Sequence, residues 1–266
     1  MKLIGFIGTG NMATAIIKGI VSSGFLKGED IGVFDVIREK AEDLSAIYGV
    51  KVFESANELC ENCRKVVLSV KPNIFSSLLP EISETVKEKS PLIISIAAGK
   101  TLGFIGSLLN EAVRAVRVMP NINAVVAEAV CGYCGNENAT KDDLEFVREM
   151  CSCIGKPVEL AEDKFPIFGV IGGCSPAYAY LFIDAMARAA VKNGLPKKQA
   201  LEISAQAVLG SAKMILESGE HPWELIDKVC SPGGTTIEGV LALQKDGFEA
   251  AVADAVESAF EKDKRL

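Results

Sequence analysis

The first part of the chain alternates between short apolar runs and stretches with helical periodicity. Runs such as KLIGFI (2–7) and KVVLSV (65–70) are nearly continuously apolar, as in strands of a parallel sheet that is covered on both faces. Apolar residues in the intervening stretches recur with the period of an amphipathic helix. Strands that alternate with helices in this way predict a doubly wound sheet. We expect strands at 2–7, 31–34, 50–53, 65–70, 92–97, 115–118, around Tyr133 and at 157–160, and helices at 11–23, 38–48, 55–62, 74–87, 102–109 and 142–153.

The hydrophobic pattern changes after residue 162, because no convincing strand pattern follows. Helix starts are expected at Ser175-Pro176, at Leu195-Pro196, near Thr235 and after Gly247. The segments AYAYLFIDAMARAAV and ALEISAQAVLGSAKMIL are apolar nearly all round, and a helix without a polar face is buried on several sides. We expect these helices to pack against a second subunit, or else only against the first domain. The predicted fold class is α/β, with a doubly wound domain at 1–162 and an all-helical dimerisation domain at 163–266.

A glycine-rich turn lies between the first predicted strand and the first predicted helix. In Gly8-x-Gly10-x-x-Ala13, the first glycine permits the tight turn, the second lets the backbone approach a pyrophosphate, and the small third residue allows close packing. The N–H groups at the helix start attract phosphate. In this position the pattern predicts a Rossmann-like dinucleotide-binding domain rather than a purely structural turn. The expected cofactor contacts in the turn are Ile7, Gly8, Thr9, Gly10, Asn11 and Met12.

Two charged residues follow the second predicted strand. Asp35 ends that strand, where an acid usually hydrogen-bonds the adenosine ribose of a dinucleotide, although it could also be a simple turn residue. Arg38 could hold a 2′-phosphate or remain a solvated charge at a helix start. We expect both residues to contact the cofactor. Asp35 should favour NADH over NADPH, because its carboxylate would repel a 2′-phosphate.

Three more predicted strands end at the same edge of the sheet, where an open α/β sheet binds its ligands. The small or turn-forming residues at these ends indicate one crevice. Lys71 could approach a nicotinamide or a substrate carboxylate there, with an ordinary surface lysine as an equal alternative. The expected contacts at this edge are Ser69, Val70, Lys71, Pro72, Ala97, Ala98, Gly99 and Asn121.

A second glycine-rich turn precedes a predicted helix in the sequence SPGGTT (231–236). The N–H groups at such a helix start can bind an anion, for example a substrate carboxylate. The hydroxyls of Thr235 and Thr236 could bind substrate, or they could equally well cap the helix.

Composition and charge exclude several classes of protein. The 266 residues are 49% hydrophobic and 24% charged, which is typical of a globular protein. The net charge is −7 and no basic stripe is present, which argues against nucleic-acid binding. No uninterrupted apolar run approaches the roughly 18 residues of a membrane span, and the start of the chain lacks a full signal-peptide core. We therefore expect a cytoplasmic protein without nucleic-acid or membrane partners.

The cysteines and the single histidine carry little predicted chemistry. Eight cysteines are too few for a disulfide framework in a chain of this length, and we expect reduced, mostly buried thiols. Cys131 and Cys134 would point to opposite faces of a strand, which disfavours a zinc site shared with Cys60 and Cys63. His221 is expected to start a helix rather than to catalyse, and no catalytic metal is predicted.

The motifs together resemble the pyrroline-5-carboxylate reductase family over essentially the whole chain. The motifs that carry the resemblance are FIGTGNMA (6–13), SVKP (69–72), SIAAG (95–99), VRVMPN (116–121), GGCSPAY (172–178) and the stretch from Gly194 to Gly239 that contains SPGGTTI. The last motif is the most specific. The resemblance implies a dinucleotide-binding domain, a helical domain that interlocks with that of a second chain, and in some members rings of dimers.

The reaction that the resemblance implies is hydride transfer from NADH or NADPH to the C=N carbon of 1-pyrroline-5-carboxylate, which gives L-proline. A protonated imine is already electrophilic, so the protein mainly positions the reactants. The implied catalytic residues are Thr236, whose hydroxyl would face the ring nitrogen, and Lys71, near the nicotinamide. The implied substrate-binding residues are Ser231, Gly233, Gly234, Thr235, Thr236 and Asn121.

Two departures from the family pattern affect these expectations. Cys174 stands in a run that many relatives fill with Gly and Ser, and Asp35-Val36 stands where many carry residues that suit a phosphate, which puts NADPH preference in doubt. Two other functions compete. A 3-hydroxyacid dehydrogenase type of enzyme would need a mid-helix lysine that residues 176–192 lack, and the intact SPGGTT turn argues against a non-catalytic NAD(P)H sensor.

Overall fold

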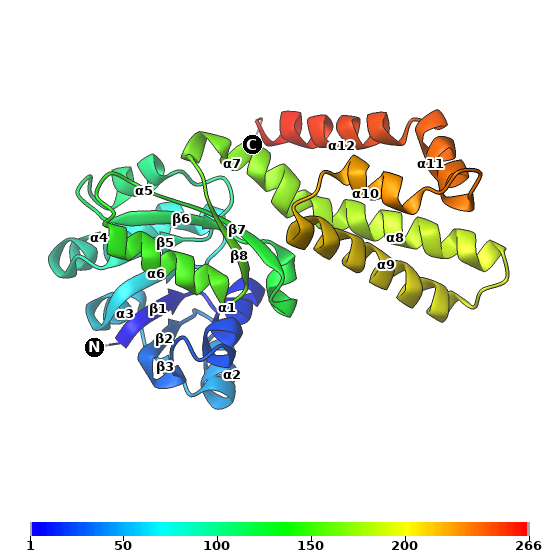
Figure 1. The fold of residues 1–266 in the computed structure, drawn as a ribbon. Coiled ribbons are helices and arrows are strands. Elements are labelled where there is room, and N and C mark those ends of the chain that lie inside the picture. The colour runs from blue at the N-terminus through cyan, green and yellow to red at the C-terminus, as the bar shows by residue number, and fades with distance from the viewer. Residues whose placement is uncertain (1, 265–266) are drawn as a thin grey trace. The chain divides into compact units, whose positions relative to one another are not determined.

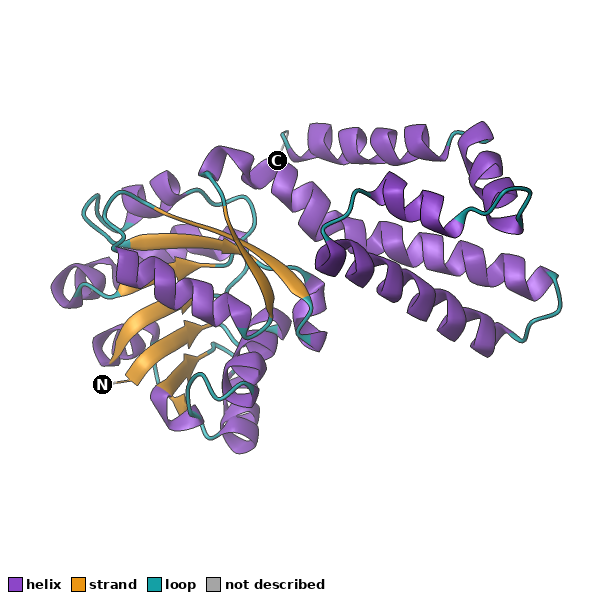
Figure 2. Ribbon diagram, in the orientation of Figure 1, coloured by secondary structure: helices purple, strands orange, loops and turns teal. Residues whose placement is uncertain are grey.

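A computed structural model describes residues 2–264 as two compact units, the first ending at Gly173 and the second beginning at Cys174 (Figure 1). The first unit contains a sheet with helices on both of its faces, and the second unit is helical (Figure 2). The boundary predicted after residue 162 falls within the first unit. The functional boundary between a dinucleotide-binding domain at 1–162 and a dimerisation domain at 163–266 stays a prediction.

One eight-stranded sheet forms the centre of the first unit, in the order β3-β2-β1-β4-β5-β6-β7-β8. The strands are β1 (Lys2–Ile7), β2 (Ile31–Phe34), β3 (Lys51–Val52), β4 (Cys63–Leu68), β5 (Leu92–Ser95), β6 (Ala115–Met119), β7 (Ala129–Gly135) and β8 (Gly155–Glu159). All pairs from β3 to β6 are parallel, as predicted. The register places Gly5 beside Gly32 of β2 and beside Val66 of β4.

The last two strands depart from the parallel pattern. β7 runs antiparallel to β6, with Val118 opposite Tyr133, and β8 is parallel to β7. A parallel pair needs a crossover connection of a dozen or more residues, usually a helix. The segment between β6 and β7 contains only a short 3₁₀ turn, Ile122–Val126, so the chain reverses direction there.

Helices cover both faces of the sheet and create two apolar layers. α1 (Asn11–Ser22), α2 (Arg38–Tyr48) and α6 (Lys141–Ser152) contribute buried residues to one layer. α3 (Ala56–Asn62), α4 (Phe75–Lys89) and α5 (Leu102–Leu108) contribute them to the other. Ile16 in the first layer and Leu79 in the second are completely buried. The predicted doubly wound architecture is confirmed.

Local signals determine where several of these helices begin and end. Ser55 caps α3 by accepting a hydrogen bond from the Glu58 N–H (3.1 Å). Thr140 and Asp143 form a capping box at the start of α6, with bonds of 3.1 Å and 3.0 Å. Gly49, at φ +70°, ends α2 in the left-handed conformation. Because such signals are local, most predicted bounds in this unit lie within a few residues of the observed ones.

The cysteines of the first unit are mostly buried, and none of the eight cysteines of the chain forms a disulfide bond. Cys131 belongs to one apolar layer and Cys134 to the other, which confirms that they point to opposite faces of β7. Burial raises the pKa of Cys60 to about 12 and that of Cys134 to about 11. These thiols therefore stay protonated and unreactive at neutral pH.

The second unit consists of α8 (Ser175–Lys192), α9 (Lys197–Ser218), α10 (Pro222–Val229), α11 (Thr235–Lys245) and α12 (Phe248–Asp263). No strand occurs after residue 162 in the part of the chain that is described, as predicted. His221 is the N-cap of α10, where its Nδ1 accepts a hydrogen bond from the Trp223 N–H (3.2 Å). The prediction that His221 starts a helix is confirmed.

α8 begins at Ser175 as predicted, but Ser175 is not its N-cap, because the chain is already helical before it. α7 (Phe165–Phe168) and a π-helical segment (Gly169–Cys174) lead directly into α8. By length and composition alone, the helical stretch Glu162–Lys192 would suffice to cross a membrane, and it is the one such stretch in residues 2–264. The sequence pattern did not predict it, since polar residues interrupt the apolar run.

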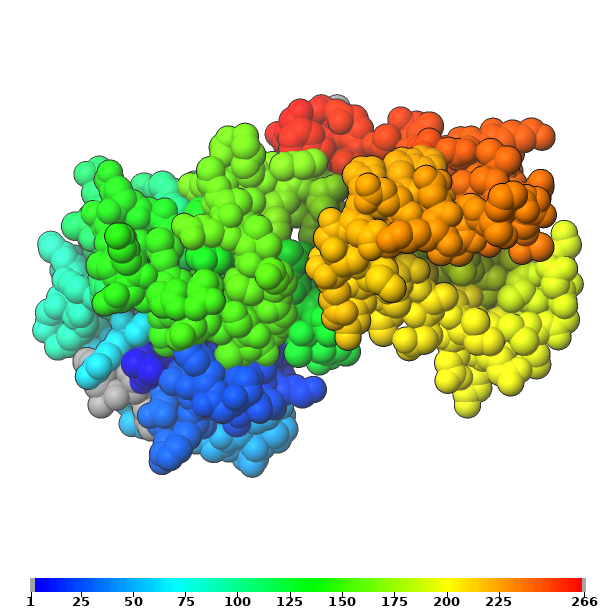
Figure 3. All heavy atoms as spheres, in the orientation of Figure 1, coloured from blue at the N-terminus to red at the C-terminus, as the bar shows by residue number. Residues whose placement is uncertain are grey.

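The helices of the second unit leave much apolar surface exposed. Buried residues in this unit are confined to Pro176, Ala187, Ala200 and Ser204 among those described. Leu181 on α8 is 72% exposed and Leu216 on α9 is 84% exposed. The surface of α9, yellow in Figure 3, is open on the face shown. Within this unit α8 and α9 pack together, and Phe182 meets Phe248 with ring centroids 5.8 Å apart.

Candidate active site

The turn at residues 8–10 joins β1 to α1 and is held from both sides by neighbouring strands. The Gly8 N–H donates to the Phe34 carbonyl (2.7 Å), and the Ser69 hydroxyl donates to the Gly8 carbonyl (2.6 Å). Gly8 has a φ of +96°, and a Cβ there would lie 2.9 Å from the Ser69 carbonyl oxygen. Only glycine fits this position.

The space in front of α1 is open. Gly10 is the N-cap of α1, and a Cβ on Gly10 would meet no atom within 4 Å. The first N–H groups of a helix have no partner within it, so they are available to a ligand at this end. The turn therefore fits the pyrophosphate of a dinucleotide.

The predicted contacts in the turn differ in exposure. Gly10 and Asn11 are exposed and Met12 is half-buried. Ile7 and Thr9 are 2% and 4% exposed, so their side chains face the protein rather than a ligand. Their predicted contribution is thus limited to backbone atoms.

Asp35 holds the glycine turn in place. One carboxylate oxygen accepts hydrogen bonds from the Thr9 N–H (2.7 Å) and the Thr9 hydroxyl (2.9 Å). The other accepts one from the Ile37 N–H (2.9 Å). A carboxylate has about four acceptor positions, so at least one remains for a ribose hydroxyl. Asp35 thus fastens the glycine turn to the end of β2, a contact that the sequence did not indicate, and its predicted contact with a ribose stays a prediction.

Arg38 is engaged by two carboxylates. Its Nε donates to Glu42 (2.7 Å), and its Nη1 donates to Glu54. These contacts raise the pKa of Arg38, chiefly through the hydrogen bond to Glu54. A 2′-phosphate would have to compete with both glutamates for the guanidinium. Neither glutamate was predicted from the sequence. Glu42 lies one helical turn after Arg38, whereas Glu54 lies 16 residues away, so only the fold reveals its contact.

The ends of β4, β5 and β6 lie at one edge of the sheet, because these strands are parallel. After β4, Ser69 and Val70 are half-buried, and Lys71 is exposed before the turn that Pro72 begins. After β5, Ala97 is buried while Ala98 and Gly99 are exposed. Ser69, after β4, and Asp35, after β2, both bond to the glycine turn. The structure therefore brings the glycine turn together with the ends of β4 and β2.

Asn121 has a structural contact that the sequence did not indicate. It is 7% exposed, and its Nδ2 donates to the Gly172 carbonyl (2.8 Å) in the π-helical segment. Its Oδ1 accepts from the Asn123 N–H (3.2 Å). The side chain therefore fastens that segment to the end of β6, and its predicted ligand contact stays a prediction.

The SPGGTT turn at 231–236 leads into α11 in the second unit. Gly233 has a φ of +68°, and the Gly234 N–H donates to the Ser231 carbonyl (3.0 Å). Gly234 is the N-cap of α11 and no side chain caps this helix, so the alternative of a threonine cap is wrong. Thr235 and Thr236 are exposed. The first N–H groups of α11 are thus available to an anion, with the Thr236 hydroxyl close by in the same turn.

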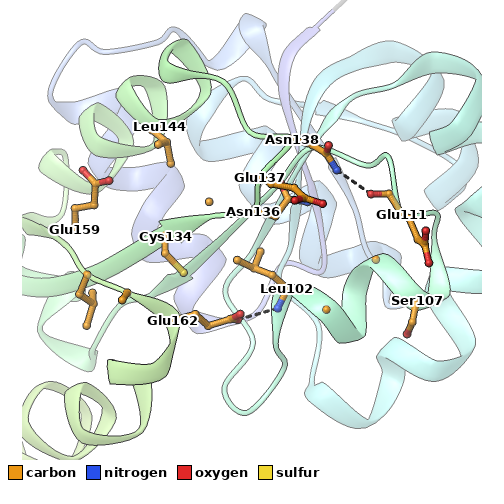
Figure 4. Close-up of a pocket in the computed structure, with 15 residues that line it drawn as sticks. Leu102, Ser107, Glu111, Cys134, Asn136, Glu137, Asn138, Leu144, Glu159 and Glu162 are labelled. Atoms are coloured by element: carbon orange, nitrogen blue, oxygen red, sulfur yellow. Dashed lines mark hydrogen bonds between the residues drawn. The ribbon is translucent and has the colours of Figure 1, made fainter.

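Within residues 2–264, neither a metal cluster nor the cleft beside α5 coincides with these turns. No group of three or more His, Cys, Asp or Glu residues among those described could hold a metal ion. A cleft of about 830 Å³ lies between α5 and the ends of β7 and β8 (Figure 4). None of the predicted site residues lines it.

The fold and these turns define a class of protein: an NAD(P)-dependent oxidoreductase with a Rossmann-like domain followed by a helical domain. Family models match both parts. Residues 3–99 match the model described as NADP oxidoreductase, coenzyme F420-dependent, and residues 162–266 match the model for pyrroline-5-carboxylate reductase dimerisation.

Full-length relatives narrow the class to one family. The chain is 42% identical to the pyrroline-5-carboxylate reductase of Escherichia coli over 266 residues, covering 100% of this chain and 98% of the relative. The chain belongs to the pyrroline-5-carboxylate reductase family, whose members are NAD(P)H-dependent oxidoreductases.

Solved structures agree in fold over nearly the whole length. The pyrroline-5-carboxylate reductase of Coxiella burnetii superposes with a TM-score of 0.95 at 30% identity, covering 99% of this chain and 98% of that one. The Plasmodium falciparum pyrroline carboxylate reductase, solved with NADP bound, has a TM-score of 0.87 at 32% identity and covers 99% and 97%. The match to the dimerisation model shows that the second unit is a dimerisation domain, which accounts for its exposed apolar helices.

Proposed function

We propose that this chain reduces 1-pyrroline-5-carboxylate to L-proline with NAD(P)H. The observation that carries the proposal is full-length similarity to the pyrroline-5-carboxylate reductase family together with an intact, exposed SPGGTT turn. Hydride for the reduction is supplied by the nicotinamide when the cofactor is bound. The substrate enters with its ring nitrogen protonated, and that proton stays on the nitrogen when the hydride adds to the neighbouring carbon, which gives the neutral amine.

The residues of the SPGGTT turn hold the substrate in this proposal. The N–H groups of Gly233 and Thr235 bind the carboxylate at the start of α11, assisted by Ser231. The Gly234 N–H donates to the Ser231 carbonyl and joins them by sharing its hydrogen between that carbonyl and the carboxylate. The Thr236 hydroxyl accepts a hydrogen bond from the protonated ring nitrogen. No strong general acid is needed, because the iminium carbon is already electrophilic and orientation supplies much of the acceleration.

The first unit holds the cofactor in this proposal. Gly8 to Met12 bind the pyrophosphate, Asp35 binds the ribose, and the residues after β4 and β5 lie along the nicotinamide half. Lys71 is an exposed cation at this edge and attracts the substrate carboxylate or a cofactor phosphate. Asn121 contributes by fixing the end of β6 to the segment around Gly172.

A Thr236→Val variant tests the role of the hydroxyl. It keeps the shape of the side chain and removes one hydrogen bond to a charged group, which should lower kcat/KM by about 1.5–3 kcal/mol, roughly 10- to 150-fold. The cofactor KM should barely change, and Thr236→Ser should restore most of the efficiency. Full efficiency of Thr236→Val with pyrroline-5-carboxylate would show that Thr236 does not touch the substrate.

NADH is the preferred cofactor in this proposal. Three carboxylates, Asp35, Glu42 and Glu54, surround the region where a 2′-phosphate would lie, and the guanidinium of Arg38 already binds two of them. Like-charge repulsion at the protein surface is worth on the order of 1–3 kcal/mol, or roughly 5- to 150-fold discrimination. The measurement is kcat/KM with each cofactor at equal ionic strength. A preference for NADPH above about tenfold would contradict the proposal.

Two variants separate the groups responsible. Asp35→Ser should improve use of NADPH and weaken use of NADH, but it also releases Thr9. Glu54→Gln leaves the glycine turn intact and frees one side of Arg38, so it should improve NADPH use alone. Glu145→Gln disrupts a similar exposed pair with Arg148 on α6 and serves as the control.

Assembly beyond the dimer and cellular location extend the proposal. Exposed apolar residues on α11 and α12, including Leu241 and Val252, offer a second contact surface through which dimers form a ring. Light scattering should then give a mass above twice the 28.3 kDa of one chain. Eight cysteines without a disulfide bond fit a cytoplasmic location, which cell fractionation would test.

A further inference from the structure

A buried positive charge lies in the second apolar layer, outside the residues assigned so far. Arg117 of β6 is 6% exposed, and its guanidinium carbon lies 4.4 Å from the centre of the Phe165 ring. A buried charge is costly unless it is paired, and removal of its partner is strongly destabilising. Its partner is Glu162, with Nη1 and Oε1 3.2 Å apart.

The same oxygen of Glu162 makes a second contact. It accepts a hydrogen bond from the N–H of Leu102, the first residue of α5 (2.8 Å; Figure 4). That N–H has no partner within the helix. Glu162 therefore joins three segments that are distant in sequence: the start of α5, the middle of β6 and the segment that leads into α7.

The contact bears on the loop between β5 and α5. This loop contains Ala97, Ala98 and Gly99, and Gly99 has a φ of +72°. The loop ends at Thr101, whose hydroxyl accepts from the Phe104 N–H (3.1 Å) inside α5. Thr101 fixes the loop only to its own helix, whereas Glu162 fixes that helix start to the sheet through Arg117.

We propose that Glu162, held by Arg117, is a positioning residue that sets the β5–α5 loop against the cofactor. The inference rests on the proposed function, in which this loop lies along the nicotinamide. Without Glu162, the Leu102 N–H loses its acceptor and Arg117 loses its counter-charge, so the start of α5 shifts and moves the end of the loop with it. A displacement of about 1 Å in a reacting group can cost on the order of 100-fold in rate.

The experiment compares three variants by steady-state kinetics with NADH and pyrroline-5-carboxylate. Glu162→Ala should raise the cofactor KM about tenfold and lower kcat about 10- to 100-fold, with the substrate KM within about twofold. Glu162→Gln keeps an acceptor for Leu102 but not the charge, so its effect should be smaller, about threefold on each parameter. Asp163→Asn is the control, because its exposed pair with Lys164 lies in the same turn. It should leave all parameters within about twofold.

A purely structural role predicts a different result. It would lower the melting temperature of Glu162→Ala while kcat and the cofactor KM of the folded enzyme match those of Asp163→Asn, and that outcome overturns the inference. If Glu162→Ala does not fold, Glu162→Gln replaces it, and equal kcat and cofactor KM of Glu162→Gln and Asp163→Asn then overturn the inference. If the unaltered chain fails to reduce pyrroline-5-carboxylate, the proposed function fails. The dissociation constant of NADH, measured by its fluorescence, then still decides whether Glu162 sets the loop.

Discussion

The two units of the chain differ in how much apolar surface each can bury alone. In the first unit, two layers of Ile, Leu, Val and Phe side chains are enclosed between the sheet and its helices. In the second unit, α10, α11 and α12 contain no buried residue among those described, and long apolar side chains remain exposed along α8 and α9. The first unit thus contains its own core, whereas the second needs another chain to complete one.

This difference follows from architecture. A sheet with helices on both faces encloses its apolar residues in two layers. Five helices in which only α8 and α9 pack extensively expose several apolar faces, and exposed apolar patches of this kind mark interaction sites. The dimerisation family model that matches residues 162–266 identifies the missing cover as a second copy.

The largest expected effect comes from a charge placed among the exposed apolar side chains of α8. Leu181→Glu on α8 should dissociate the dimer and abolish activity, because an obligate interface buries more than about 2,000 Å² and does not accept an unpaired charge. Ile47→Glu on α2 is the control, since Ile47 is 69% exposed against 72% for Leu181. Its effect on the unfolding free energy should stay within about 0.5 kcal/mol. If Leu181→Glu is active and light scattering gives the mass of a dimer, the exposed surface of α8 is not the subunit interface, and the contrast between the two units fails.

Truncation of matched leucines sharpens the comparison. Leu79→Ala in the buried layer should cost about 2–5 kcal/mol of unfolding free energy, through lost burial and the cavity left behind. Leu209 on α9 is 56% exposed in one chain, so the effect of Leu209→Ala should arise at the subunit interface. The dimer dissociation constant, measured by dilution in light scattering, distinguishes them, because only a substitution at the interface weakens the association of folded chains. A weakened dimer of Leu79→Ala would contradict this assignment.

The smallest expected effect concerns acid stability. Burial by itself would raise the pKa of Asp143, but hydrogen bonds from the Thr140 N–H and hydroxyl and the Arg114 guanidinium together hold that pKa below its usual value. The stabilisation is therefore present above the unfolded-state pKa of about 3.9 and is lost as the pH falls through the lower folded value. Asp143→Asn should cost about 1–3 kcal/mol at pH 7, and the difference should fade in acid.

The exposed pair Asp184–Arg188 on α8 provides the counterpart of Asp143 in the second unit. The hydrogen bond from Arg188 lowers the pKa of Asp184, but in the single chain both side chains are exposed to water, where such pairs contribute little. Asp184→Asn should leave the pH dependence of unfolding unchanged. If Asp143→Asn and Asp184→Asn change the unfolding free energy equally, burial of Asp143 does not increase its contribution to stability.

The sequence by itself determined the fold class, most element bounds in the first unit and the two glycine-rich turns. These features depend on periodicity, caps and backbone freedom, which act over a few residues. Gly8 at positive φ and His221 at the start of α10 are examples, since each follows from neighbours in the chain.

Only the tertiary structure decided which side chains meet. The bond from Thr9 to Asp35, the binding of Arg38 by Glu54, the contact of Asn121 with Gly172 and the joining of Leu102 to Arg117 by Glu162 link residues far apart in the chain. The antiparallel direction of β7 and the continuous helix before Ser175 also depend on how segments pack. A local pattern shows that a residue is polar or that a segment is apolar. Its partner is fixed only when the sheet brings distant segments together, and for the second unit only when another chain covers it.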